Sequence, residues 1–334
     1  MSARALFLSV SLLALADAAA ADVNIYTTRQ TSLIEPVTAA FTNETGINVN
    51  LAYVKEGLVE RLKAEGRRSP ADLVMTVDIA NLQKIVDADV VQPIESTVLT
   101  NAIPAELRSS ENLWFGLTTR ARILYASNDR VAADEITTYE DLADDKWRGR
   151  ICTRSGLHNY NLALMSGMIA HLGIDGATSW AEGMKSNLAR KPEGNDRAQV
   201  KAIWAGQCDI SLGNTYYMGQ MLADPEQVPW AQSVRIVFPT FENGGTHINV
   251  SGVAMTKAAP NYDEALQFME FLVSPKAQAI YAEINNEYPV LADAELSDLV
   301  QSWGQFTADD TSLETLAGNR GDALRIMEVV DFDG

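Results

Sequence analysis

The 334-residue chain contains few of the side chains that most metal centres and catalytic sites use. It has two cysteines and three histidines, and the histidines occur at none of the spacings that are typical of metal sites. Zinc and copper sites depend on thiolate and imidazole ligands, so the composition argues against both. No Ser/His/Asp grouping and no nucleophile elbow is visible, which argues against a serine hydrolase.

Positive charge is scarce as well. Lysine and arginine together number 26 against 44 acidic residues, and the formal net charge is −18. Such a surface repels phosphate backbones and anionic lipids, so nucleic acid and anionic membranes are excluded as partners. Beyond the first residues, no apolar run approaches the roughly 20 residues that a membrane-spanning helix needs. We find no internal repeat and no low-complexity segment, so the composition predicts a soluble, acidic protein.

The first 21 residues have the pattern of a secretory signal peptide. Arg4 precedes a short apolar run at residues 5–15, and small residues follow up to Ala21. The mature chain is therefore expected to start near Asp22, outside the cytoplasm. In an oxidising compartment Cys152 and Cys208 are expected to form one disulfide, with two buried free thiols as the alternative.

Strands and helices alternate along the mature chain, which predicts a mostly parallel sheet covered by helices on both faces. The long extended segment at 113–127 and the strand at 248–255 are predicted to cross between two α/β domains. This assigns residues 22–118 and 245–334 to the first domain, with the C-terminal helices packed on it. Residues 119–244 form the second domain. Turns at strand ends would then face a ligand cleft.

Tyrosines follow three of the predicted strands, at the strand ends where open α/β sheets bind ligands. They are Tyr26, Tyr160, Tyr216 and Tyr217. Adjacent side chains on a strand point to opposite faces, but a strand-to-helix turn can direct both rings of a pair into one cleft. Phenolate is a hard oxygen donor that suits ferric iron, whose charge can deprotonate a group with an ordinary pKa of about 10. The alternative is a set of half-buried tyrosines at a domain interface.

Two arginines lie where they could assist such a site. Arg29 is three residues beyond Tyr26, and Arg120 lies on the predicted crossover. A guanidinium group could hold a bidentate oxyanion such as carbonate, or stabilise phenolates against mutual repulsion. The alternative for each arginine is an interdomain salt bridge or a solvated side chain.

Four stretches of the sequence carry a resemblance to a known family. They are Asn24-Ile25-Tyr26-Thr27-Thr28-Arg29-Gln30, Arg154-Ser155-Gly156-Leu157-His158-Asn159-Tyr160-Asn161, Asn214-Thr215-Tyr216-Tyr217 and Asn285-Asn286-Glu287-Tyr288-Pro289-Val290. With these stretches the chain resembles the periplasmic ferric-iron-binding proteins of bacterial ABC importers, in their tyrosine-rich branch, over essentially its whole mature length. The resemblance implies the type II periplasmic-binding-protein fold, in which two α/β domains are joined by two crossover strands around a ligand cleft.

The resemblance also implies a ligand set and a partner. Tyr160, Tyr216 and Tyr217 would bind Fe(III) from the second domain, and Tyr26 would be a further ligand from the first. Arg29 stands where other members bind a synergistic carbonate. Ile25 and Thr27 flank Tyr26, so the histidine ligand of another branch is missing. The expected protein is a periplasmic monomer that delivers Fe(III) to an inner-membrane ABC permease with its ATPase.

Two other functions are compatible with the sequence. A binding protein of the same fold could take an anionic or organic solute such as a phosphonate, thiosulfate or polyamine. It would hold an anion mainly through Arg29 and the turns at Ser155 and Thr215. A secreted enzyme with a tyrosine as general base is the second alternative.

Overall fold

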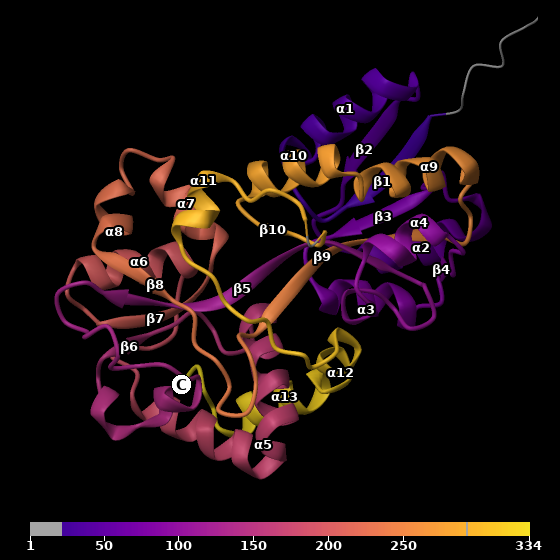
Figure 1. Cartoon of the computed structure of the whole chain (residues 1–334). Coiled ribbons are helices and arrows are strands. Elements are labelled where there is room, and N and C mark those ends of the chain that lie inside the picture. Colours follow the sequence, from indigo (N-terminus) through magenta and orange to yellow (C-terminus); the bar gives the residue numbers. More distant parts are fainter. Residues whose placement is uncertain (1–21, 292) are drawn as a thin grey trace, which may run out of the picture.

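The structure is a computed structural model that describes residues 22–291 and 293–334 (Figure 1). The predicted signal peptide lies outside the described residues. Within them, no helix is long and apolar enough to cross a membrane. The strands are β1 (Val23–Thr27), β2 (Val49–Tyr53), β3 (Leu73–Thr76), β4 (Val91–Gln92), β5 (Phe115–Ser127), β6 (Ile151–Cys152), β7 (Ile210–Asn214), β8 (Val234–Val237), β9 (Ile248–Thr256) and β10 (Tyr288–Pro289).

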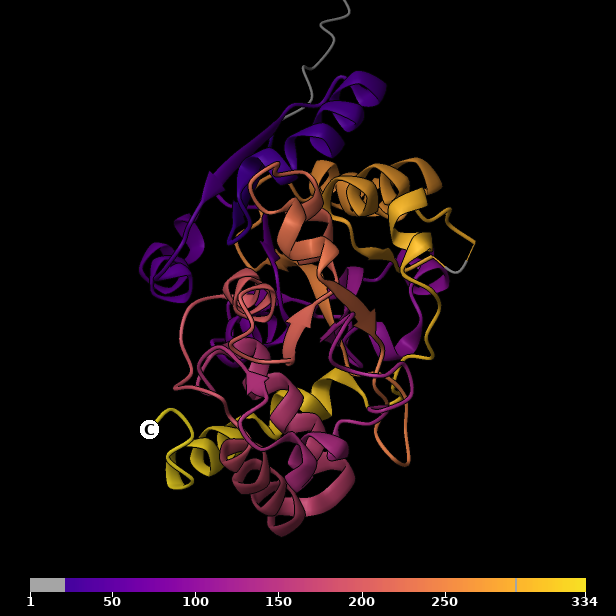
Figure 2. The same cartoon turned by 90° about the vertical axis from the view of Figure 1, so that its left-hand side faces the viewer.

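Helices cover the strands in both domains (Figures 1 and 2). They are α1 (Glu35–Thr45), α2 (Leu58–Glu65), α3 (Ile79–Asp87), α4 (Thr97–Ala102), α5 (Asn159–Ser186), α6 (Asp196–Trp204), α7 (Tyr216–Leu222), α8 (Val228–Gln232), α9 (Tyr262–Leu272), α10 (Pro275–Asn285), α11 (Asp298–Ser302), α12 (Leu313–Gly318) and α13 (Arg320–Val329). The strand order β2-β1-β3-β9-β5-β7-β6 places the first-domain strands at one end of the sheet and the second-domain strands at the other.

The first domain is built on three parallel strands. Ile25 in β1 lies opposite Leu51 in β2 and Leu73 in β3, and β9 closes this part of the sheet by pairing antiparallel to β3. The apolar face of α1 packs on the sheet through Phe41. Its ring lies 5.0 Å from the ring of Phe268 in α9, in an edge-to-face contact. Truncation of a buried phenylalanine in such a core typically costs about 3–5 kcal/mol.

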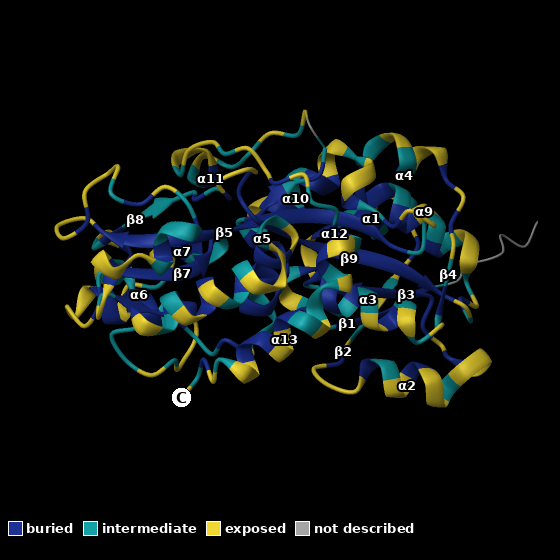
Figure 3. Ribbon diagram, turned by 90° about the horizontal axis from the view of Figure 1, so that it is seen from below, coloured by how far each residue is buried: buried dark blue, intermediate teal, exposed yellow. Residues whose placement is uncertain are grey.

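β5 connects the two domains, as the length of this segment predicted. All thirteen of its residues are buried. Its first half pairs with β9, with Thr119 opposite Val250, and its second half pairs with β7, with Leu124 opposite Leu212. Figure 3 shows β5 and β9 in dark blue through the middle of the molecule. One continuous strand therefore carries side chains of both domains, and it passes directly behind the turns that hold the tyrosines.

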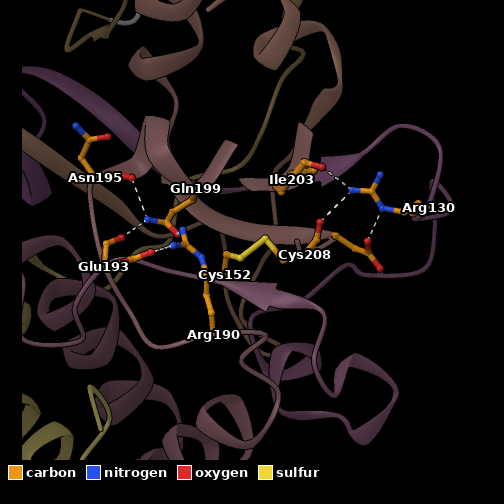
Figure 4. Close-up of a disulfide and its surroundings, with 9 residues drawn as sticks. Arg130, Cys152, Arg190, Glu193, Asn195, Gln199, Ile203 and Cys208 are labelled. Atoms are coloured by element: carbon orange, nitrogen blue, oxygen red, sulfur yellow. Dashed lines mark hydrogen bonds and ion pairs between the residues drawn. A yellow bond between two sulfur atoms is a disulfide. The ribbon is translucent and has the colours of Figure 1, made fainter. Parts of the chain in front are cut away.

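The second domain contains the predicted disulfide, which Figure 4 shows. Cys152 at the end of β6 and Cys208 before β7 are bonded, with Cα atoms 5.9 Å apart. Arg130 donates hydrogen bonds to the carbonyl oxygens of Ile203 and Cys208, at 2.7 and 3.0 Å. These contacts fix the chain on both sides of the turn that leads into β7.

The C-terminal helices differ from the prediction that both pack on the first domain. Leu313 and Leu316 of α12 do join the first-domain core. α13 instead lies along α5 and contributes Ile326 and Met327 to the core of the second domain, together with Phe332 beyond its end (Figures 1 and 2). The spacing of these apolar residues indicated a buried face, but spacing alone does not say against which domain a face is buried. The remaining domain boundaries stay a prediction.

Loss of the disulfide should destabilise the second domain. Cys152 and Cys208 are 56 residues apart in sequence. In the chain-entropy model, opening a loop of that length lowers the free energy of unfolding by about 4 kcal/mol. The Cys152→Ala/Cys208→Ala double variant should therefore unfold at clearly lower urea concentration than the parent protein. Equal midpoints for the two proteins, with equal slopes, would contradict this.

Candidate metal-binding site

Three of the predicted tyrosines come together on the second domain. Tyr160 is in the first turn of α5, and Tyr216 and Tyr217 open α7. The hydroxyl of Tyr216 donates to the hydroxyl of Tyr160 at 3.1 Å, and the rings of Tyr216 and Tyr217 lie 4.3 Å apart. β7 ends at Asn214, so the pair lies on a helix and escapes the alternation of a strand.

The loop before Tyr160 is held by its own side chains. His158 caps α5, and its Nδ1 accepts a hydrogen bond from the backbone N–H of Tyr160 at 3.2 Å. The ring of His158 contacts the ring of Tyr160 edge-on, with centroids 4.6 Å apart. Burial, with the charges of Arg154 and Arg122 nearby, lowers the pKa of His158 to about 4. The imidazole is therefore neutral at pH 7 and can act as the hydrogen-bond acceptor.

A buried carboxylate beneath the tyrosines was not recognised in the sequence. Asp196 is fully buried and pairs with Arg122 at 2.8 Å and with Arg154 at 3.0 Å. The same carboxylate accepts the backbone N–H of Asn214 at 3.1 Å. The guanidinium carbons of Arg122 and Arg154 lie 5.9 and 5.2 Å from the centroid of the Tyr160 ring. Two cations and one anion leave a net positive charge beneath the tyrosines.

A signal for this group exists in the sequence. Arg122 lies two residues after Arg120 on β5, so both arginines share one face of a strand that contains no other charged residue. A charge inside such a strand has to be paired. The partner, Asp196, is 74 residues away, and no local pattern identifies it.

Without metal, burial favours the neutral form of Tyr216 and Tyr217. Burial raises the pKa of Tyr216 well above its ordinary value, and the neighbouring Tyr160 and Tyr217 raise it further. The pKa of Tyr217 is also raised, by burial first and by Asp196 second. A trivalent cation would displace these protons, since metal charge inverts the local pKa order. The cluster can therefore offer three hard oxygen ligands in exchange for protons.

The structure does not bring Tyr26 to the other three. Its hydroxyl donates to Glu65 at 2.9 Å and accepts from Arg61 at 2.6 Å. The guanidinium carbon of Arg61 also lies 4.0 Å from the centroid of the Tyr26 ring. These contacts are to α2, in the first domain. The physical reason is that Arg61 and Glu65 of α2 bind the Tyr26 hydroxyl and so hold this side chain on their face of β1.

Arg29 is already paired within the first domain. It forms a buried ion pair with Glu287 at 2.9 Å and donates to Asn285 and to the hydroxyl of Ser251. In this structure Arg29 therefore forms neither an interdomain salt bridge nor a free anion-holding group. Its charge is neutralised by a carboxylate whose pKa is lowered, against the effect of burial, by Arg29 and Arg120.

Arg120 lies closer to the tyrosines. It donates to the carbonyl oxygen of Val77 and to the hydroxyl of Ser251, both of them neutral groups. The small cavity in front of it is lined by Arg120, Arg122, Tyr160, Asn214, His247 and Asn249. Its guanidinium group therefore adds positive charge at the back of the candidate site.

A solvent-open groove leads from the tyrosines to the first domain. Its lining residues are Thr28, Tyr53, Lys55, Glu56, Gly57, Leu58, Val59, Glu60, Val77, Asp78, Asn81, Lys84, Ile85, His158, Asn159 and Tyr160. Within residues 22–291 and 293–334, no group of three or more His, Cys, Asp or Glu side chains could hold a metal ion. In this part of the chain, the tyrosine cluster is thus the arrangement best suited to a hard cation.

Known proteins resemble this chain in sequence and in fold. The family of bacterial extracellular solute-binding proteins matches residues 37–308. Iron uptake protein A1 of Synechocystis sp. is 44% identical over 309 residues, which are 92% of this chain and 86% of that protein. The crystal structure of Mannheimia haemolytica ferric iron-binding protein A in an open conformation is 48% identical, with a TM-score of 0.91, and covers 94% of this chain and 100% of that one.

A third similarity is to a protein solved with a bound ligand. The Trichodesmium protein IdiA (FutA), in complex with iron and citrate ligands, is 42% identical with a TM-score of 0.90. The match covers 93% of this chain and 99% of that one. The chain belongs to the bacterial extracellular solute-binding proteins, in the family of the ferric-iron-binding proteins.

Proposed function

We propose that this protein captures Fe(III) in the groove between its domains and delivers it to an ABC permease. Tyr160, Tyr216 and Tyr217 supply the phenolate ligands. The observation that carries the proposal is the 3.1 Å approach of the Tyr216 and Tyr160 hydroxyls above the buried Arg122–Asp196–Arg154 group. Phenolate oxygens suit a hard trivalent cation, and the named relatives are iron-uptake proteins.

The family supports a proposal for the place of action and the partners. The protein works in the periplasm as a monomer after its signal peptide, residues 1–21, has been removed. Its partner is an inner-membrane permease with its ATPase, and it neither binds nucleic acid nor catalyses a reaction. Iron is its cargo, and the protein retains it only until the permease takes it over.

Domain closure would couple capture to delivery. The ligand tyrosines lie on the second domain, and the opposite wall of the groove is formed by first-domain residues such as Tyr53, Lys55 and Glu56. An ion that contacts both walls binds the closed form more tightly and shifts the population towards it. The permease can then distinguish loaded from empty protein by shape.

A co-bound anion completes the proposed site. Three phenolates from one side leave coordination positions that face the groove, and a small oxyanion such as carbonate, or a carboxylate, can fill them. The Trichodesmium relative was solved with iron and citrate together, which supports an oxygen-donor anion of this kind. Arg120 is better placed than Arg29 to face that anion, because its hydrogen bonds are to the Ser251 hydroxyl and the Val77 carbonyl, whereas Arg29 pairs directly with Glu287.

The alternative of an anionic solute without metal is less well supported. It required Arg29 and the turns at Ser155 and Thr215 as the main contacts, and the structure engages the first two of these. Arg29 is paired with Glu287, and the hydroxyl of Ser155 donates to the carboxylate of Asp333. Both groups are thus engaged by protein carboxylates, which an anion would have to displace.

A visible absorption titration tests the ligand set. Addition of ferric citrate to the mature protein should give a saturable orange-red colour from phenolate-to-iron charge transfer. Tyr216→Phe should lose that colour and weaken iron binding by more than the 10–100-fold that is typical of residues beyond the ligands. Tyr26→Phe is the matched control and should keep both colour and affinity, because the Tyr26 hydroxyl contacts Arg61 and Glu65.

Two outcomes of the titration would contradict the proposal. No colour at any ratio of iron to the parent protein would remove the ferric function. Loss of colour in Tyr26→Phe, with Tyr216→Phe unaffected, would reverse the assignment of the ligands.

Iron binding should be linked to proton release. Burial raises the pKa of Tyr216 and Tyr217, so both are protonated at pH 7 and must lose a proton to bind the metal. Affinity therefore rises with pH and falls as the solution becomes more acidic. In a pH-stat measurement at fixed pH, Tyr217→Phe should release about one proton fewer per iron than the parent protein.

Protons that citrate takes up when ferric citrate gives up its iron are the same in both pH-stat measurements, so they cancel in the difference between the two proteins. Equal proton release by the two proteins, at equal iron loading, would show that Tyr217 does not bind iron as phenolate.

A further inference from the structure

The segment that follows α13 closes onto the loop that carries Tyr160. The carboxylate of Asp333 accepts a hydrogen bond from the hydroxyl of Ser155 and another from the backbone N–H of Gly156, the latter at 2.7 Å. Phe332 is 2% exposed and packs on the same turn. A Cβ atom on Gly156 would lie 2.6 Å from the Phe332 ring, so only glycine allows this close approach.

These contacts are relayed to Tyr160 through the turn itself. The hydroxyl of Ser155 accepts the N–H of Leu157 at 3.1 Å, and its carbonyl oxygen accepts the N–H of His158 at 3.2 Å. His158 in turn accepts the N–H of Tyr160 and touches its ring. Asp333 is therefore connected to Tyr160 by an unbroken series of short contacts, although it does not touch the phenol.

The segment is anchored independently of this turn. Lys185 in α5 donates to the carbonyl oxygen of Val330 at 2.9 Å, and Lys191 donates to that of Gly334. At the other end of α13, Arg320 donates to the side-chain oxygen of Asn159 at 2.9 Å. α13 and the residues after it thus contact the loop on both sides of His158, from a helix that is packed into the domain core.

We propose that Asp333 is a positioning residue for iron binding, an inference that rests on the proposed ferric function. Its carboxylate fixes the turn at Ser155–His158 and thereby the orientation of the Tyr160 phenol. Tyr160 lies at the groove and is partly exposed, so packing around its ring does not hold it alone. A ligand that is pre-ordered costs less to immobilise when the metal binds, and the bound state lasts longer.

The test compares two aspartates of the same segment. Asp333→Ala removes the carboxylate from the turn. Asp331→Ala is the control, because it removes an equal charge from an exposed neighbour whose ion pair is with Lys185, at 3.5 Å. For each ferric-loaded protein, the rate of iron loss to a competing chelator and the position of the charge-transfer band are measured. Asp333→Ala should release iron about tenfold faster, which corresponds to about 1.4 kcal/mol, and should shift the band.

The band position separates positioning from simple stability, because a loss of stability alone does not change the phenolate geometry at the metal. Asp333→Ala with the release rate and band of the parent protein would overturn the proposal, whatever its melting temperature. Equal effects of Asp331→Ala and Asp333→Ala would overturn it too, since charge alone would then be responsible.

A second variant, Ser155→Ala, tests the proposal if Asp333→Ala folds poorly. Ser155→Ala deletes one of the two hydrogen bonds that Asp333 accepts, together with the bond that the Ser155 hydroxyl accepts from the N–H of Leu157, and leaves Asp333 in place. It should accelerate iron release in the same direction, and the effect of the Ser155→Ala/Asp333→Ala double variant should be smaller than the sum of the two single effects. Additive effects would contradict the proposed relay.

The parent protein, titrated in parallel, must turn orange-red, and its failure to do so would overturn the ferric function itself.

Discussion

The candidate site depends on one buried carboxylate, Asp196. A buried charge is tolerated only when it is paired and hydrogen-bonded, and Asp196 meets this condition through Arg122, Arg154 and the backbone N–H of Asn214. These partners come from the interdomain strand β5, the loop before α5 and the end of β7. The carboxylate thus holds together the segments that lead to Tyr160 and to the Tyr216–Tyr217 pair. Loss of Asp196 would leave two guanidinium groups unpaired beneath the tyrosines, a change that typically costs several kcal/mol.

This arrangement assigns different roles to the two domains. The second domain carries the three phenols in fixed positions, whereas the first domain forms the opposite wall of the groove. Under the proposed function, metal would bind first to these three phenols, and closure would follow without rearrangement of the set. Arg122 and Arg120 are two residues apart on β5, so the strand that joins the domains also carries the charges behind the site. A single strand, β5, therefore both connects the domains and supplies positive charge behind the site.

The sequence was informative where a local pattern determines the outcome. Tyrosines after strands indicated a cluster at the carboxyl edge of the sheet, and the hydroxyls of Tyr160 and Tyr216 do lie together. The length of the segment at 113–127 identified the interdomain strand.

The sequence was uninformative where the outcome depends on a distant partner. Alternation in β1 shows that Tyr26 and its neighbours face opposite ways, but Arg61 and Glu65 decide which way Tyr26 faces. The apolar face of α13 was visible too, and only the fold shows that α5 covers it.

A charge count around the site explains why an anion should accompany the metal. Arg29, Arg120, Arg122 and Arg154 lie behind the tyrosines, and the buried carboxylates of Glu287 and Asp196 neutralise two of these four cations. Three phenolates would neutralise Fe(III) itself, so the loaded site would keep the excess positive charge of the arginines. At low dielectric such an excess is costly, and a mono- or divalent oxyanion on the metal reduces it. Glu287 pairs directly with Arg29 and also lies close enough to Arg120 for that guanidinium group to lower its pKa, so the excess positive charge is shared by Arg120 and the Arg122–Arg154 pair. The electrostatics therefore favour an anion that binds the metal from the groove within reach of Arg120, whereas the family resemblance alone would have placed it at Arg29.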